Sequence, residues 1–281
     1  APGTFSYSPV DMDLTLNQAM TPNTVSPGGG AITSWEIEPD VPNGLNFGSS
    51  NGTIWGTPTV LQTSPITYTI WANNSGGSAS TTVTITIIDI AASISYSLDE
   101  IVATLGVPIS PHSNPTNTGG AVVTWEISPD PGPHFHFNTA NGVISGTPGA
   151  LLTRTQYTIY GNNSGGSSIA YVNVTINDAA PDFYYGISGG SQHFVRLVVN
   201  ATINPVVPNH RVGGGMPTSC TTSPSLPTGL SISSSCVITG TPTVLSSYAW
   251  YTVTASNSGG TSSFPIINKL FIQGICCLVI L

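Results

Sequence analysis

The order of apolar and polar positions predicts short β-strands along the chain. Residues 82–87, Thr-Val-Thr-Ile-Thr-Ile, alternate between hydroxyl and branched apolar side chains, which is typical of a strand with one buried face. Aromatic strands are expected around Tyr68, Tyr157 and Tyr251, with Gly, Pro, Asn and Ser between the predicted strands. Helical periodicity is not evident in any stretch. We therefore expect an all-β protein.

The predicted strands belong to a long internal repeat. Gly-Thr-Pro occurs three times, at residues 56–58, 146–148 and 240–242. Asn-Ser-Gly-Gly follows each copy, at residues 74–77, 163–166 and 257–260. The Gly-Thr-Pro copies are 90 and 94 residues apart, which fits one small β-sandwich per repeat better than the shorter period of a solenoid.

The glycines and prolines of each repeat mark turns. Asn-Gly at residues 51–52 and 141–142 predicts tight hairpin turns, because both residue types tolerate positive φ. Proline has no N–H to donate, so Gly-Thr-Pro should end its strand, and Ser-Gly-Gly should turn the chain into the last long strand. Gly-Lys-Ser/Thr does not follow Gly-Thr-Pro, so the motif does not indicate nucleotide binding.

The third repeat carries the motifs most clearly, in residues 224–233, 237–243 and 251–260. This pattern resembles the He_PIG-type immunoglobulin-like domains found in tandem in microbial cell-surface and extracellular proteins. The resemblance implies three tandem immunoglobulin-like β-sandwich domains displayed outside the cell, and it brings no catalytic residues. We expect domains at residues 1–91, 92–180 and 181–273, followed by an apolar strand or tail at residues 274–281.

Only 6% of the residues are charged, against about 25% in an ordinary soluble domain. Ser, Thr and Asn therefore supply most of the polar side chains. With 39% hydrophobic residues and a mean hydropathy of +0.19, such a surface suits a chain that is glycosylated or assembled into a polymer. The candidate N-glycosylation sites are Asn51, Asn73, Asn162, Asn173 and Asn200.

The few charges are unevenly distributed. Residues 1–153 contain ten Asp or Glu and no Lys or Arg, whereas residues 154–281 contain all four cations and two Asp. Either this asymmetry is accidental, or the acidic front of one molecule meets the less acidic back of the next. The scarcity of basic residues argues against nucleic-acid binding.

Two cysteines of the third repeat replace a Trp and a Gly of the other repeats. Cys220 aligns with Trp35 and Trp125, and Cys236 aligns with Gly52 and Gly142. Because both positions changed together, we predict a Cys220–Cys236 disulfide, which closes a loop of 17 residues worth about 3 kcal/mol. A disulfide indicates an oxidising, extracellular setting.

The last eight residues are apolar or small and are far fewer than the ~20 residues needed to span a bilayer. This tail extends the last strand of its own domain, or completes a sheet in a neighbouring subunit, or is the remnant of an anchor or of a longer chain. In the second case the assembly residues are Ile275, Cys276, Cys277, Leu278, Val279, Ile280 and Leu281. The N-terminal strand at residues 4–7 is the alternative donor.

No arrangement of residues indicates catalysis or a cofactor. The pair His134 and His136 could hold a metal on one strand face, but the favoured interpretation is two exposed residues beside a core Phe135. Calcium at the junctions, held by Asp89, Asp178 or Asp182, is a further alternative.

The chain begins Ala-Pro-Gly, as expected of an exported protein whose signal peptide has been removed. The preferred function is a non-enzymatic structural subunit of an extracellular filament or surface appendage. Its partner would be the chain itself as a homopolymer, with covalent glycans, no nucleic acid and no membrane span. The alternative is an adhesin stalk or tip that binds glycan or protein.

Overall fold

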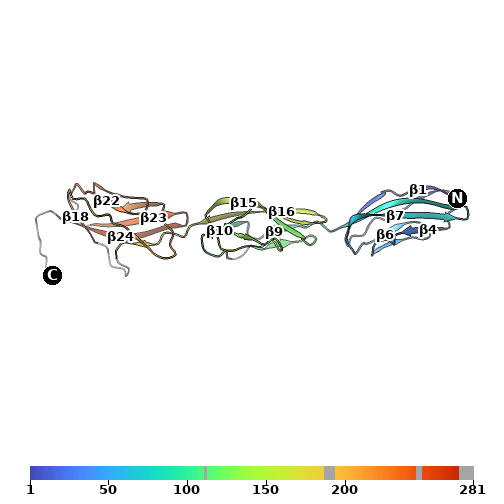
Figure 1. The fold of residues 1–281 in the computed structure, drawn as a ribbon, viewed down its shortest axis with the longest axis horizontal. Coiled ribbons are helices and arrows are strands. Elements are labelled where there is room, and N and C mark those ends of the chain that lie inside the picture. Colours follow the sequence, from blue (N-terminus) through green and yellow to red (C-terminus); the bar gives the residue numbers. More distant parts are fainter. Residues whose placement is uncertain (111–112, 187–193, 245–248, 272–281) are drawn as a thin grey trace.

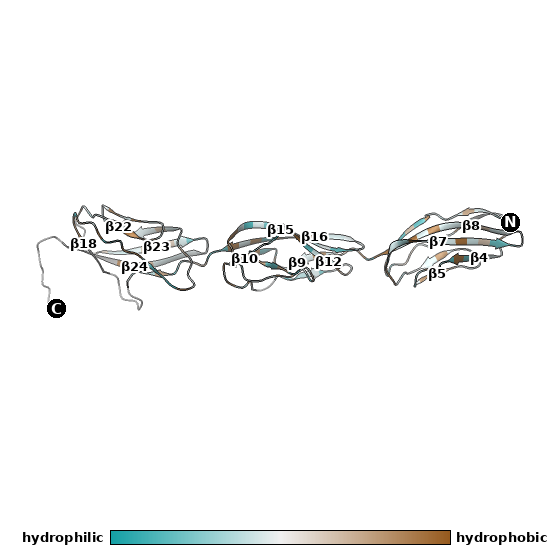
Figure 2. Ribbon diagram, in the orientation of Figure 1, coloured by the Kyte–Doolittle hydropathy of each residue, from teal (hydrophilic) through white to brown (hydrophobic). Residues whose placement is uncertain are grey.

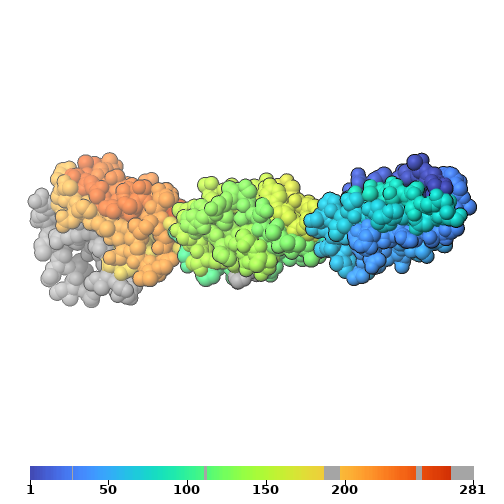
Figure 3. All heavy atoms as spheres, turned by 45° about the vertical axis from the view of Figure 1, so that its right-hand side comes forward, coloured from blue at the N-terminus to red at the C-terminus, as the bar shows by residue number. Residues whose placement is uncertain are grey.

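The computed structural model describes residues 1–110, 113–186, 194–244 and 249–271, and it contains three β-sandwiches arranged end to end (Figure 1). The space-filling view shows the three bodies following one another along a single axis (Figure 3). The first domain, with the N-terminus, lies at one end of this rod and the third domain lies at the other. Strands are the only regular elements among the described residues, so the predicted fold class is confirmed.

The first domain defines the architecture. Its strands are β1 (Pro2–Ser6), β2 (Asp11–Thr15), β3 (Ser26–Gly29), β4 (Ser34–Glu38), β5 (Leu45–Phe47), β6 (Ile54–Gly56), β7 (Gln62–Asn74) and β8 (Gly77–Ile88). One layer is the four-stranded sheet β2-β8-β7-β4, in which β2 runs parallel to β8. The pairs β1-β3 and β5-β6 lie opposite it, and a bridge from Asn23 to Ile54 connects the segment before β3 to β6.

The other two domains repeat this order. The second contains β9 (Ile94–Tyr96), β10 (Glu100–Thr104), β11 (Pro115–Asn117), β12 (Thr124–Ser128), β13 (His136–Phe137), β14 (Ile144–Ser145), β15 (Leu152–Asn163) and β16 (Gly166–Asn177). The third contains β17 (Phe183–Tyr184), β18 (Phe194–Val198), β19 (Asn209–His210), β20 (Ser219–Ser223), β21 (Leu230–Ile232), β22 (Ile238–Gly240), β23 (Ala249–Asn257) and β24 (Gly260–Phe271). Their large sheets are β10-β16-β15-β12 and β18-β24-β23-β20.

The long hairpin of each domain shows why these residues form strands. In β8, Val83, Ile85 and Ile87 are fully buried and the intervening threonines face outward, as the alternation predicts. Figure 2 shows the corresponding change between apolar and polar colours along the strands of the first domain. Each fully buried Val or Ile contributes about 1.5–3 kcal/mol to the stability of the sandwich.

A tyrosine in each domain, buried in the first and third domains and half-buried in the second, connects the layers at one turn. The hydroxyls of Tyr7, Tyr96 and Tyr185 donate hydrogen bonds to the backbone carbonyls of Gly52, Gly142 and Cys236. Burial raises the pKa of each phenol well above its ordinary value, so the hydroxyl stays protonated and able to donate.

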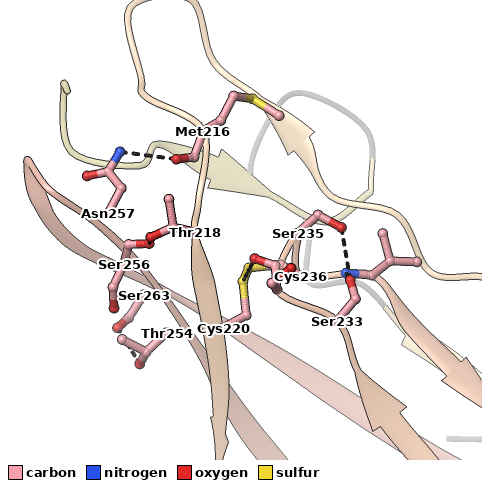
Figure 4. Close-up of a disulfide and its surroundings, with 12 residues drawn as sticks. Met216, Thr218, Cys220, Ser233, Ser235, Cys236, Thr254, Ser256, Asn257 and Ser263 are labelled. Atoms are coloured by element: carbon pink, nitrogen blue, oxygen red, sulfur yellow. Dashed lines mark hydrogen bonds between the residues drawn. A yellow bond between two sulfur atoms is a disulfide. The ribbon is translucent and has the colours of Figure 1, made fainter. Parts of the chain in front are cut away.

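The same turn contacts a Trp in two domains and forms a disulfide in the third. A Cβ atom at Gly52 would lie 2.9 Å from the Trp35 ring, and one at Gly142 would lie 2.5 Å from the Trp125 ring. At the equivalent place Cys220 and Cys236 form a disulfide with Cα atoms 5.3 Å apart (Figure 4). Cys236 keeps the positive φ of the glycines that it replaces, 62° against 67° at Gly52.

We predict that a Trp–Gly contact can replace the disulfide of the third domain. The double variant C220W/C236G should keep the third domain folded, because it restores the Trp-over-Gly contact of the other domains. The single variant C220A should lose about 3 kcal/mol, since it removes the cross-link, and it leaves a Cβ-bearing residue at positive φ. Denaturant unfolding of the full chain measures both changes. If the double variant unfolds as easily as C220A, the Trp–Gly pair cannot replace the disulfide.

Candidate functional site

Two joints connect the three domains, and both use the same hydrogen bonds. At the first joint, the Asp89 N–H donates to Ser164 Oγ over 2.8 Å, and the Ile90 N–H donates to Asp89 Oδ1 over 2.9 Å. At the second joint, the Asp178 N–H donates to Ser258 Oγ over 2.9 Å, and the Ala179 N–H donates to Asp178 Oδ1 over 2.9 Å. The serines of the second and third Asn-Ser-Gly-Gly turns therefore bind the chain that leaves the preceding domain.

The asparagine of the turn holds the joint from a second direction. Asn163 Nδ2 donates to the carbonyls of Ile90, at 2.7 Å, and Ala121, at 3.2 Å. Asn257 Nδ2 makes the same two bonds, to Ala179 at 2.7 Å and to Met216 at 3.2 Å. One amide thus connects the linker to the loop before β12 or β20. Together with the serine contact, it fixes the linker at two points to the domain that follows.

The first glycine of each turn permits a close backbone approach. A Cβ atom at Gly165 would lie 2.2 Å from the Asp89 carbonyl oxygen, and one at Gly259 would lie 1.9 Å from that of Asp178. Because both obstacles are backbone atoms, no side chain fits there without moving the joint. Sequence reasoning explained Asn-Ser-Gly-Gly as a turn and missed this role. The sequence places Asp89 and Asp178 before the two junctions, but it does not show that the turns contact them.

The junction aspartates therefore bind protein groups. Asp89 and Asp178 accept from the next backbone N–H, and Asp182 Oδ1 accepts from Arg211 Nη1 at 3.0 Å. Within the described ranges no three His, Cys, Asp or Glu side chains are grouped as metal ligands. His136 is exposed, and His134 Nδ1 lies 3.4 Å from the Ala150 carbonyl oxygen, with Phe135 buried between them in the sequence.

Two of the candidate glycosylation sites lie in a hydrogen-bonded cluster that is repeated in the first two domains. Asn73 Nδ2 donates to Glu36 Oε1 at 3.1 Å, and Ser78 Oγ donates to Asn73 Oδ1. The second domain contains the same cluster around Asn162, which donates to Glu126 Oε1 at 3.2 Å. At both sites, the Nδ2 atom to which a glycan would be attached therefore already donates a hydrogen bond.

The other three candidate glycosylation sites differ in the solvent exposure of the asparagine. Asn51 and Asn200 are exposed, and no hydrogen bond from either Nδ2 atom is found among the described residues. Asn173 is half-buried, and its Oδ1 atom is buried without a partner. The structure thus favours Asn51 and Asn200 as attachment sites. The assembly candidates from Ile275 to Leu281 lie outside the described residues.

The chain matches the family described as "Putative Ig domain" (He_PIG) over residues 2–88 and 192–267. It belongs to this family of immunoglobulin-like domains. The second domain, outside the two matched ranges, has the same strand order as its neighbours. The recognition of a tandem immunoglobulin-like chain is therefore confirmed.

Among curated proteins, the chain is similar to the "Serine-rich adhesin for platelets" of Staphylococcus aureus. For strain N315 the identity is 28% over 148 residues, which is 52% of this chain and 6% of the adhesin. For strain MRSA252 the identity is the same and the coverage of the adhesin is 10%. The chain thus spans a tenth or less of the length of these relatives.

Among solved structures, the I-band fragment I67-I69 from titin aligns with a TM-score of 0.43 and 16% identity, over 98% of this chain and 99% of that one. Drosophila OTK extracellular domains 3-5 align with a TM-score of 0.38 and 12% identity, over 93% and 94%. Within the described part of this immunoglobulin-like chain, no helix has the length and hydrophobicity to cross a bilayer.

We predict that an N-glycosylating host attaches glycans at Asn51 and Asn200 in preference to Asn73 and Asn162. The reason is that the first two side chains are exposed and their Nδ2 atoms donate to no partner among the described residues, whereas the other two Nδ2 atoms donate to a glutamate. Glycopeptide mass spectrometry measures the occupancy of each site, with N51Q/N200Q and the matched pair N73Q/N162Q as variants. The first pair should remove most of the glycan mass. Equal loss in both pairs would contradict this ranking.

Proposed function

We propose that this chain is a non-catalytic spacer of an extracellular adhesion protein, in which three immunoglobulin-like domains form a semi-rigid stalk. The observation that carries the proposal is the pair of identical joints, each closed by a serine, an asparagine and a glycine contact. A flexible linker would not need such contacts, because water forms hydrogen bonds with the backbone groups of an exposed chain.

The location outside the cell is supported by two further observations. The Cys220–Cys236 disulfide is stable in an oxidising compartment. The matched relatives are adhesins by name, which supports a surface-displayed protein without assigning their ligand to this chain.

The distribution of exposed aromatic side chains favours a stalk over a binding tip. Trp55 is 39% exposed, Tyr171 is 55% exposed and Trp250 is 46% exposed, and each lies in a different domain. A tip that binds glycan or protein would gather its aromatic side chains in one patch. Separate single residues are ordinary features of a protein surface.

We predict that the joints determine the shape of the molecule in solution. N163A and N257A each remove three hydrogen bonds of about 1 kcal/mol each, two donated by Nδ2 at the joint and one accepted by Oδ1 from the first glycine of the turn. The matched control N74A alters the equivalent turn of the first domain, where Asn74 Nδ2 donates to Ala31 and no linker between two domains of this chain is held. Small-angle scattering should show a broader distribution of maximum dimension for the first two variants and an unchanged one for N74A. A wild-type profile typical of freely jointed domains would overturn the spacer function.

A second function, head-to-tail self-assembly into a filament, is favoured by the charge asymmetry. The first domain is acidic and has no Lys or Arg, whereas Arg196 and Lys269 stand opposite each other in the register of β18 and β24 in the third domain. An apolar eight-residue strand buried in a neighbour would contribute on the order of 10 kcal/mol before ordering costs. That is enough to hold subunits together without a covalent link.

We predict that removal of residues 274–281 abolishes any such assembly. A matched variant replaces these eight residues with glycine and serine, so that length is kept and hydrophobicity is lost. Sedimentation velocity and negative-stain imaging should show monomers for both variants and assemblies for the full chain. If the truncated protein assembles as readily as the full chain, the tail is not the donor.

A further inference from the structure

We propose that the groove beside β2 in the first domain binds the C-terminal segment of a second copy, residues 274–281, as an added β-strand. This inference rests on the head-to-tail assembly proposed above. It names the acceptor site, which is formed entirely by described residues.

The groove follows an open sheet edge. In the described part of the chain, strand β2 pairs with β8 on one side only, and a groove of about 450 Å³ lies between β2 and the segment 18–23. Val10 and Leu16, just outside β2, bond to Thr84 and Ile88. In a parallel ladder alternate residues face the partner, so the N–H and C=O groups of Asp11 and Asp13 point to the open edge. An incoming strand would find free donors and acceptors there.

The groove also contains a buried acceptor without a donor. Asn23 is 4% exposed, and its Nδ2 atom donates to the Pro9 carbonyl at 2.8 Å and contacts Met12 Sδ at 3.2 Å. Its Oδ1 atom has no hydrogen-bond partner among the residues that the structure describes. Such a group is costly to leave unpaired, and a backbone N–H of an added strand is the kind of donor that would satisfy it.

The second domain offers a natural comparison. Its equivalent groove, beside β10, is smaller at about 340 Å³. The position of Asn23 is taken there by Ser113, whose Oγ atom donates to the Leu98 carbonyl at 3.1 Å. The unpaired acceptor therefore distinguishes the first domain, and we assign the acceptor site to it alone.

The chemistry of the tail suits this groove. Residues 274–281 are Gly-Ile-Cys-Cys-Leu-Val-Ile-Leu and carry no side-chain charge. Met12, Leu14 and Met20 line the groove, and the flexible methionines adapt to apolar side chains. The exposed Asp11 and Asp13 also line the groove, and they belong to a domain without Lys or Arg, which favours the approach of the third domain with its Arg196 and Lys269.

The occupant must come from another molecule. Residue 281 lies ten residues after Phe271 and therefore at most ~36 Å from it. The 12-residue strands of the second and third domains are each ~40 Å long, and both domains separate the end of β24 from the first domain (Figure 1). Asp11 pairs with Thr84, which lies seven residues, or ~23 Å, inward along β8 from Gly77 at the tip of the rod. The tail can cover β2 only if the third domain of the donor overlaps the first domain of the acceptor.

A proline on the open edge tests the site. D13P removes an N–H that faces the groove and is not used by β8, so the domain should still fold. The matched control V102P places proline at the equivalent position of the second domain, because Val102 pairs with Thr175 as Asp13 pairs with Thr86. In sedimentation velocity of the full chain, the apparent association constant should fall at least tenfold for D13P and change less than twofold for V102P.

A cross-linking experiment keeps the proposal testable if D13P fails to fold. Q18C places a thiol on the exposed groove wall, and V107C does so in the second domain. Under mild oxidation, peptide mapping should find Q18C, and not V107C, linked to Cys276 or Cys277 of another copy. Assembly that survives D13P, or equal cross-linking in both variants, overturns the site while leaving the filament function intact. A full chain that stays monomeric at every concentration overturns both.

Discussion

The shape of this molecule depends on one close contact, the packing of each Asn-Ser-Gly-Gly turn against the backbone that enters its domain. The contact brings Gly165 and Gly259 so near to a carbonyl oxygen that a single added carbon would not fit. Only 6% of the residues are charged, and each ion pair found among the described residues lies within a single domain. Hydrogen bonds accepted by serine Oγ and donated by asparagine Nδ2 orient the domains instead, and the third domain follows the second as the second follows the first.

The repeats show that one fold tolerates two different solutions at its centre. Trp35 and Trp125 each cover a glycine, whereas Cys220 and Cys236 join covalently at the same place. In all three domains a tyrosine hydroxyl binds the carbonyl of that turn residue. The position of the turn is therefore set by the tyrosine and the positive φ, and the residue that packs above it is free to vary as long as it holds the two layers together.

Much of the fold could be predicted from the sequence, because its signals are local. The alternation at residues 82–87 identified the buried face of β8, and the joint change of two aligned positions identified the cysteine pair. The roles of Ser164 and Asn163 could not be predicted, since their partners belong to the linker from another domain. Asn23 was also missed, because an unpaired acceptor can be recognised only when every neighbouring donor is known.

The parallel pairing of β2 with β8 has a mechanical consequence. The chain enters each domain at the end that carries the Asn-Ser-Gly-Gly turn and leaves it at the opposite end, directly after β8, β16 or β24. Tension along the rod would pull the two parallel partners, such as Asp11–Thr15 and the end of β8, in opposite directions along their lengths. A ladder loaded in this way must break its bonds together, whereas a peeled hairpin breaks them one at a time. The same short strand that leaves a sheet edge open thus acts as a clamp against force.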